Sequence, residues 1–199
     1  MGASPSAAGS GPPDGLSEGC VGAPVAAGSA LPIAGTEAIM RPKAHGSCGA
    51  AVPRVLRWGV DCAVADRICC FNRHYAEHSG YWLRTQFLAE VDRAVETTFY
   101  DSVSGSPLFV APRGRSFGAF EGESRDHGWP SFRDAEVAWE YVRVLPDGEC
   151  VSVTGTHLGH NLPDRRGNRY CINLVSVAGM PPAGAPAGGS HEAPGSRSA

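Results

Sequence analysis

Two histidines and one cysteine stand close together near the C-terminal end of this 199-residue chain. His157 and His160 are three positions apart, and Cys171 follows eleven residues after His160. A cysteine thiolate is a strong nucleophile, and a neighbouring imidazole can lower the pKa of the thiol or transfer a proton. These residue types therefore indicate thiol chemistry. A cysteine in a β-strand can also be a small buried hydrophobic residue, so the spacing alone leaves both interpretations open.

The residues around the cysteine have the alternating pattern of a β-strand. Apolar residues recur at every second position from Tyr170 to Leu174, which predicts a strand over residues 170–176. Side chains on one face of a strand repeat every two residues, so Arg169, Cys171 and Asn173 should share a face. There the arginine would favour the thiolate, and the asparagine could hold the geometry by hydrogen bonding.

Two further elements can be predicted from pattern. Residues 137–154 are dense in β-branched and aromatic residues on both sides of the turn sequence Leu145-Pro146-Asp147-Gly148, which predicts an antiparallel hairpin. Upstream, Leu83, Phe87 and Val91 recur at helical spacing between polar residues, which predicts an amphipathic helix over residues 81–95 that covers the domain.

Three separated motifs, taken in order, resemble the signature of the B-type methionine-R-sulfoxide reductases, the SelR domain family. They are Gly128-Trp129-Pro130-Ser131-Phe132, then His157-Leu158-Gly159-His160, then Gly167-Asn168-Arg169-Tyr170-Cys171-Ile172-Asn173. Residues 104–109, Ser-Gly-Ser-Pro-Leu-Phe, resemble the start of the same domain. The resemblance extends from about residue 99 to residue 179.

The resemblance implies an oxidoreductase that repairs oxidised proteins by reducing the R epimer of methionine sulfoxide. Cys171 would attack the sulfur and become a sulfenic acid. The catalytic residues implied are Cys171, His157, His160, Asn173 and Arg169, and the substrate-binding residues are Trp129 and Phe132. The expected fold is mainly β, with two small antiparallel sheets around a shared core, a peripheral helix and disordered termini.

The sequence departs from the family at its metal site. Most members bind a structural zinc through two cysteine pairs, which fall here on Asp101, Ser104, Val151 and Thr154. Thiolate ligands are required there, so we expect no metal at that site and no bound cofactor.

The sequence also departs at the recycling cysteine, because His127 stands where many members carry that residue. An external thiol reductant, namely thioredoxin, glutaredoxin or glutathione, would then regenerate Cys171. It would act directly or through another cysteine: Cys62, Cys69, Cys70 or Cys150.

Composition limits the partners. The chain has 17 basic and 20 acidic residues, a net charge of −3, so nothing calls for nucleic acid. No apolar run approaches the ~20 residues of a membrane-spanning helix. The expected partners are oxidised protein substrates and a thioredoxin-type reductant, and the expected state is a monomer. An odd count of seven cysteines and no visible secretory signal indicate an intracellular protein.

Four segments are expected. Residues 1–52, rich in Gly, Ala, Ser and Pro, should be a disordered leader. If that leader is a transit segment, the protein would be in a plastid or mitochondrion rather than the cytoplasm. Residues 53–98 should be a lead-in segment with the amphipathic helix, residues 99–179 the catalytic domain, and residues 180–199 a disordered tail.

Two other functions remain open from the residues alone. One is a non-catalytic β-domain that binds methionine-containing peptides or a protein partner. The other is a Cys–His hydrolase that acts on an acyl group, which the placement of Cys171 within a strand disfavours.

Overall fold

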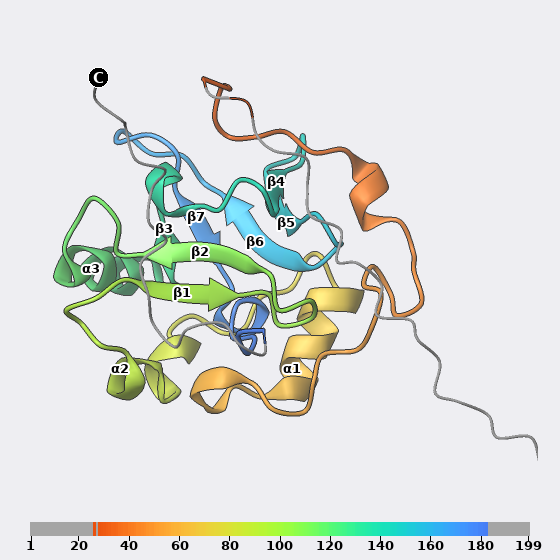
Figure 1. Ribbon diagram of the computed structural model, residues 1–199, viewed down its shortest axis with the longest axis horizontal. Helices are drawn as coiled ribbons and strands as arrows, with labels where there is room; N and C mark the ends of the chain where they lie inside the picture. Colours follow the sequence, from red (N-terminus) through yellow and green to blue (C-terminus); the bar gives the residue numbers. More distant parts are fainter. Residues whose placement is uncertain (1–25, 27, 183–199) are drawn as a thin grey trace, which may run out of the picture.

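Two antiparallel sheets organise the part of the chain that the computed structural model describes, which is residue 26 and residues 28–182 (Figure 1). The two-stranded sheet pairs β1 (Thr97–Tyr100) with β2 (Pro107–Ala111). The five-stranded sheet has the order β3-β7-β6-β5-β4. Its strands are β3 (Ser131–Phe132), β7 (Tyr170–Ile172), β6 (His157–Asn161), β5 (Glu149–Ser152) and β4 (Val142–Val144). The prediction of a mainly β fold with two small antiparallel sheets is confirmed.

An aromatic core joins the two sheets. Phe109 of β2 stacks on Phe132 of β3 with ring centroids 4.4 Å apart, and Phe99 of β1 meets Phe132 edge-on at 5.0 Å. All three side chains are fully buried. Full burial of a side chain of this size stabilises a fold by about 1.5–3 kcal/mol, so this cluster fixes one sheet against the other.

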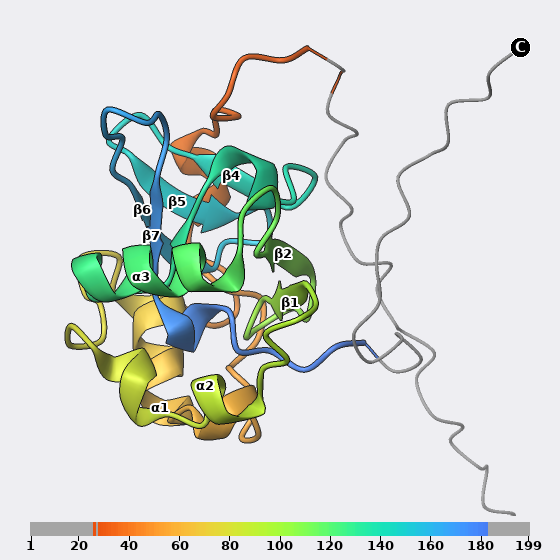
Figure 2. The same ribbon diagram turned by 90° about the vertical axis from the view of Figure 1, so that its left-hand side faces the viewer.

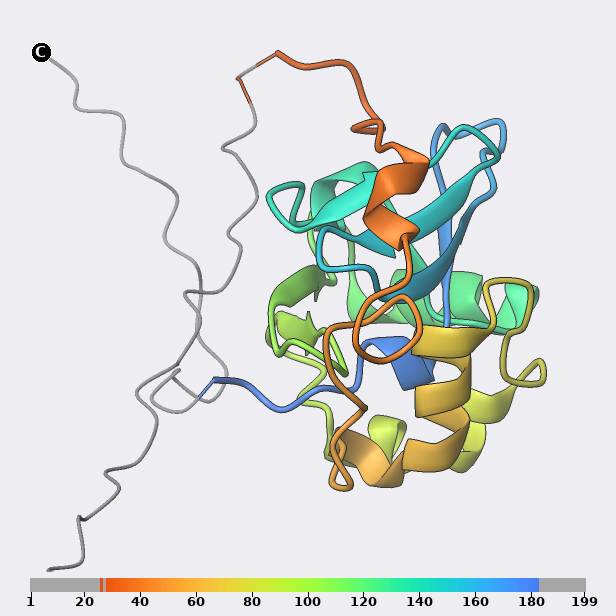
Figure 3. The same cartoon turned by 90° about the vertical axis from the view of Figure 1, so that its right-hand side faces the viewer.

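The longest helix in the described residues is α3 (Phe117–His127), which the sequence interpretation did not predict. It begins at Ser116, whose hydroxyl accepts a hydrogen bond from Ala119 N at 3.2 Å, and ends at Gly128 with φ +87°. Both are standard helix-end signals. Two glycines inside the helix weaken its helical pattern. Figures 2 and 3 show the five-stranded sheet on one side of α3 and the helices α1 (Cys62–Asp66) and α2 (Phe87–Glu90) on the other.

The predicted helix over residues 81–95 is largely wrong. The chain forms a 3₁₀ turn at Tyr81–Arg84 and a single α turn, α2, and it leaves helical geometry at Val91. Side chains explain the breaks. Thr85 is extended, and its hydroxyl accepts from Phe87 N at 3.2 Å, while Asp92 accepts from Ala94 N at 2.9 Å. Such local bonds offer the backbone an alternative to the helical ladder.

The hairpin is confirmed over β4 and β5, where Val144 pairs with Cys150 and Gly148 takes φ +91°. Its first strand begins at Val142 rather than at residue 137. Before it, Asp134–Glu136 form a 3₁₀ turn and Val137 makes an isolated bridge to Phe109. The predicted third strand also ends early, at Ile172, and Leu174–Ser176 turn as a 3₁₀ helix. Its last residues are therefore folded back rather than extended.

Residues 33–52, predicted to be part of a disordered leader, pack on the domain (Figure 3). Gly35 N donates to Val144 O at 2.8 Å and Val144 N donates to Ile33 O at 3.0 Å, so this segment covers the free edge of β4. Met40, in the 3₁₀ turn Glu37–Met40, buries its side chain against Leu145 and Val151. Hydrogen bonds to the sheet edge and a few buried apolar side chains therefore order this segment, although its composition predicts disorder.

The rest of the leader and the tail, residues 1–25, 27 and 183–199, lie outside the described residues, so the disorder predicted there stays a prediction. The remaining 3₁₀ turn is Arg57–Gly59, and α1 continues as a π-helical turn at Arg67–Phe71. Within the described residues, no helix has the length and apolar character needed to cross a membrane.

Candidate active site

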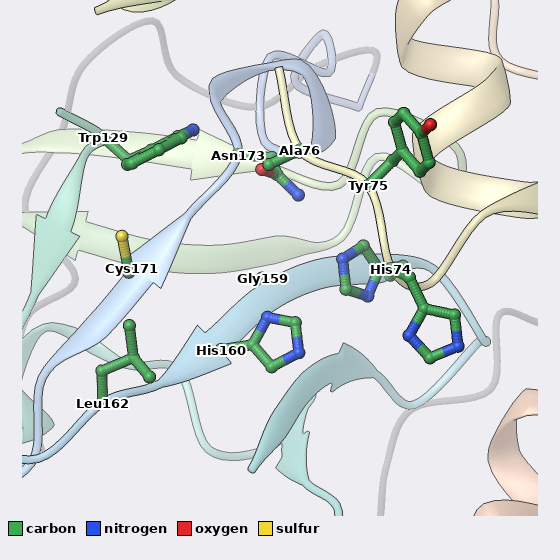
Figure 4. A pocket seen from close by; sticks show the side chains of 10 residues that line it. His74, Tyr75, Ala76, Trp129, Gly159, His160, Leu162, Cys171 and Asn173 are labelled. Carbon is green, nitrogen blue, oxygen red and sulfur yellow. The ribbon is translucent and has the colours of Figure 1, made fainter. Parts of the chain in front are cut away.

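A cavity of about 290 Å³ opens where β6 and β7 meet the loop before Tyr81 (Figure 4). Five of the seven site residues predicted from the sequence line it. The complete lining is His74, Tyr75, Ala76, Trp129, His157, Gly159, His160, Leu162, Cys171 and Asn173. The three motifs, which lie far apart in sequence, therefore meet in one pocket.

The pairing of β6 with β7 sets Cys171 beside His160. The two residues are direct partners across the antiparallel pair, so their side chains emerge on the same face. Gly159, next to His160, makes this close approach possible. A Cβ atom at that position would lie 2.1 Å from Cys171 O, and the backbone has φ +151°. Only glycine fits both the contact and the conformation.

His157 is held by a buried carboxylate that the sequence interpretation missed. Its Nδ1 lies 2.6 Å from Glu149 Oε1, and Arg73 Nε donates to Glu149 Oε2 at 2.8 Å. Burial alone would raise the pKa of Glu149, but its bonds to His157 and Arg73 outweigh burial and hold the pKa below its ordinary value. Glu149 is therefore a carboxylate that binds the Nδ1–H of His157, which leaves Nε2 for the pocket.

Burial favours the neutral form of His160. Burial, followed by the charge of His157, lowers the pKa of His160 below its ordinary value. The two rings meet edge-on with centroids 5.6 Å apart. At neutral pH His160 is thus a neutral imidazole that can accept a proton, and it stands opposite the thiol.

Two opposing effects act on the pKa of the Cys171 thiol. Burial raises the pKa of the thiol, and the nearby charge of Arg169 lowers it in part. Arg169 is only 8% exposed, and its Nε and Nη1 have no hydrogen-bond partner among the described residues. Asp164 Oδ2 lies 3.8 Å from Nε. Arg169 does not line the cavity, but its positive charge can stabilise a thiolate at Cys171.

One side of the pocket is apolar. Figure 4 shows Trp129 and Leu162 on either side of the Cys171 sulfur. Trp129 is fixed by its indole Nε1, which donates to Glu77 O at 3.1 Å. Phe132, predicted to bind substrate, does not line the pocket. It is fully buried in the aromatic core, because its side chain lies on the opposite side of β3, against Phe109.

Asn173 brings a free hydrogen-bond donor to the pocket. Its side chain is 2% exposed, and Nδ2 has no partner within the described part of the chain. The backbone N of Asn173 donates to Leu158 O at 2.8 Å, which fixes the residue just after β7. An unpaired buried donor costs free energy unless a ligand satisfies it, so this amide favours a polar ligand.

None of the other described cysteines lines the pocket. Cys69 and Cys150 are fully buried, and burial raises the pKa of both thiols well above the ordinary value. Cys70 is also buried, and Cys62 is partly exposed on α1. A recycling cysteine next to Cys171 is therefore not found among them.

Hydrogen bonds connect two of the four positions that hold zinc in the family resembled. Asp101, fully buried, accepts from Thr154 Oγ1 at 3.3 Å and from Thr156 Oγ1 at 2.9 Å. Val151 points into a separate apolar cluster. This network joins the start of the β1–β2 turn to the loop before β6.

A different group of side chains could hold a metal ion. His45, Asp66 and Cys70 offer ligand atoms within 4.8 Å of one another. His45 Nε2 lies 2.9 Å from both carboxylate oxygens of Asp66, so these two side chains satisfy each other by hydrogen bonding. None of the three lines the pocket, so this group has no part in its chemistry.

Comparison with known proteins gives no family assignment: no family model matches the chain, and no curated protein matches it. The chemistry of the pocket residues therefore carries the functional argument.

Proposed function

We propose that this protein is a peptide-methionine (R)-S-oxide reductase, a thiol-dependent oxidoreductase that acts on oxidised proteins. The observation that supports this most strongly is one pocket that combines Cys171, two histidines, an unpaired amide donor and an apolar tryptophan wall. A sulfoxide has matching parts: an electrophilic sulfur, a basic oxygen and a methyl group.

The reaction starts with ionisation of the thiol. His160, neutral and opposite Cys171, accepts the thiol proton, and Arg169 stabilises the thiolate. The thiolate attacks the sulfoxide sulfur and forms a transient sulfur–sulfur bond. This bond and the sulfur–oxygen bond of the substrate then break as the oxygen moves to the sulfur of Cys171. Methionine gains two electrons and leaves, and Cys171 loses two and becomes a sulfenic acid.

Proton transfer to the sulfoxide oxygen lowers the barrier. His157 can act as the acid through Nε2, because the carboxylate of Glu149 binds Nδ1 and orients the ring. Asn173 Nδ2 can hydrogen-bond the same oxygen. Two external thiols then restore the enzyme. The first condenses with the sulfenic acid and releases water, and the second displaces Cys171 from the mixed disulfide.

The pocket also supports a choice between epimers. Trp129 and Leu162 offer an apolar surface for the methyl group, and the histidines form the polar side. Inversion at sulfur exchanges the oxygen and the methyl group between these two sides. The S epimer would then place an oxygen against the indole and a methyl group against the proton donors, which costs an unsatisfied polar contact.

The reductant would be external. Since no second described cysteine lines the pocket, thioredoxin, glutaredoxin or glutathione would reach the sulfenic acid directly. Tyr75 and Leu162 are 60% and 46% exposed at the pocket, which suits contact with a protein substrate or a protein reductant.

The deciding experiment measures turnover of a peptide that carries separated R or S methionine sulfoxide, first with dithiothreitol and then with thioredoxin. The variants are Cys171→Ser and, as a matched control outside the pocket, Cys62→Ser. We expect reduction of the R epimer only, loss of turnover in Cys171→Ser, and full dithiothreitol-driven turnover in Cys62→Ser. His160→Ala should slow the reaction by about 10²–10⁴-fold.

Three outcomes would contradict the proposal. Cys171→Ser could keep wild-type turnover, the S epimer could be reduced as fast as the R epimer, or the folded protein could reduce neither. In the last case, binding of methionine-containing peptides without turnover would favour the alternative of a non-catalytic binding domain.

A further inference from the structure

Glu77 is a buried acid that lies next to the pocket without lining it. It lies in the loop that brings His74, Tyr75 and Ala76 to the cavity, but its own side chain is only 4% exposed and does not line it. Its Oε1 accepts a hydrogen bond from Leu174 N at 2.5 Å. The residue thus connects the loop to the chain three positions after Cys171.

The backbone of the same residue holds the apolar wall. Glu77 O accepts the indole N–H of Trp129 at 3.1 Å. Three residues later, Gly80 N donates to Gly128 O at 2.8 Å, immediately before the tryptophan. Gly128 has φ +87°, and a Cβ there would lie 2.0 Å from Ser79 Oγ, so the loop and the tryptophan segment are closely packed.

The carboxyl group has no cation to balance it. Its Oε2 has no hydrogen-bond partner among residues 28–182, and no ion pair to Glu77 exists there. Burial raises the pKa of Glu77 to about 7, and the backbone N–H groups of Leu174 and Val175 oppose this only in part. The group therefore changes charge near neutrality. In its ionised form it raises the pKa of the Cys171 thiol, against the effect of Arg169.

We propose that Glu77 is a positioning residue for this pocket: it fixes the Trp129 wall and the chain after Cys171, and its negative charge opposes that of the Cys171 thiolate. The charge effect concerns the thiol alone. Its consequence for turnover rests on the proposed function.

The direction of the pH effect follows from the charge. Below pH 7 Glu77 is neutral and places no charge near the thiol. Above pH 7 it is a carboxylate, and the thiolate then forms less readily than it would beside a neutral group. Removal of the charge should accelerate thiol reactions on the alkaline side only.

The test is the rate at which iodoacetamide alkylates Cys171 between pH 5.5 and 9, followed by mass spectrometry of the peptide that contains it. Glu77→Gln removes the charge and keeps an oxygen that can accept from Leu174 N. Glu140→Gln is the matched control, because Glu140 is exposed and its charge is not among those that shift the pKa of Cys171. We expect Glu77→Gln to react about threefold faster than wild type at pH 8, because removal of the negative charge lowers the pKa of the Cys171 thiol. At pH 5.5 the rates should be equal, and Glu140→Gln should follow wild type throughout.

Two results would overturn the proposal. Coincident profiles of Glu77→Gln and wild type would show that the charge does not act on the thiol. A difference that is equally large at pH 5.5 would indicate a loosened loop and no charge effect.

Wild-type protein alone can also decide, should circular dichroism show that Glu77→Gln is unfolded. Its alkylation profile should contain an inflection near pH 7, separate from that of the thiol and from that of His160, whose pKa lies below its ordinary value. The absence of an inflection near pH 7 would refute the proposal. The assay contains no sulfoxide. A protein that shows the predicted profile but reduces no sulfoxide would therefore refute the proposed function and leave the role of Glu77 intact.

Discussion

Gly159→Ala should destabilise the protein at the point where β6 and β7 bring the pocket residues together. The new Cβ would lie 2.1 Å from Cys171 O and 3.0 Å from Ile172 Cα. Real Cβ atoms keep at least 3.0 Å from such neighbours, so β6 and β7 must separate by nearly an ångström beside Cys171. The φ of +151° adds strain for any residue with a side chain.

The free-energy cost can be worked from these two terms. Backbone strain of this kind costs about 1–3 kcal/mol, and overpacking of a buried site costs about 1–3 kcal/mol. Together they predict that the free energy of unfolding falls by about 2–6 kcal/mol, a large share of the ~5–15 kcal/mol of an ordinary domain. The measurement is urea unfolding followed by circular dichroism.

Gly122→Ala is the control, because the same chemical change there should have the opposite sign. Gly122 is exposed inside α3, and a Cβ would meet nothing within 4 Å. Alanine in a helix interior should raise the free energy of unfolding by about 0.5–1 kcal/mol. The reasoning is refuted if Gly159→Ala unfolds within 0.5 kcal/mol of wild type, or if the two variants lose stability equally.

Further predictions concern buried acids. Glu123 is 3% exposed and pairs with Arg115, Arg133 and Arg166. Glu123→Gln removes these three ion pairs, while Arg115 keeps Glu136 and Arg133 keeps Asp164, so urea unfolding should show a loss of about 1–3 kcal/mol; an unchanged midpoint would exclude this role. Asp101→Ala should cost about 1–3 kcal/mol, because the two threonine hydroxyls lose their acceptor, and the same assay measures it. Glu149→Gln should lower kcat for sulfoxide reduction about 10²-fold by weakening the hold on His157, and equal kcat would show that the carboxylate does not assist. Thermal melts between pH 7 and 3 should show that the protein loses stability as the pH falls below about 4.5. The reason is that ion pairs hold the pKa values of Glu123 and Glu149 below their unfolded values despite burial. A Glu123→Gln variant should lose less stability over that range, and a loss identical to that of wild type would contradict the assignment.

The sequence by itself determined the features that depend on neighbours along the chain. The Leu145–Gly148 turn was predictable because proline and glycine restrict the backbone locally. The alternation that ends at Cys171 and Ile172 predicted a strand because side-chain direction repeats every two residues. The motifs also indicated which residues could meet, and Cys171, His157, His160, Asn173 and Trp129 do line one pocket.

Only the tertiary structure decided which side chains face that pocket and which charges act within it. Phe132 shares a motif with Trp129, yet it packs in the core: Ser131 is the partner of Cys171 across β3 and β7, and the next residue of a strand points to the opposite face. The segment 33–52 is ordered through its hydrogen bonds to the free edge of β4, and this contact cannot be predicted from the local sequence pattern.

Glu149 and Glu77 carry no spacing signal, because their partners lie 8 and 97 residues away. Burial and pairing over such distances arise from packing of the whole chain, and they fix the protonation states on which the proposed chemistry depends.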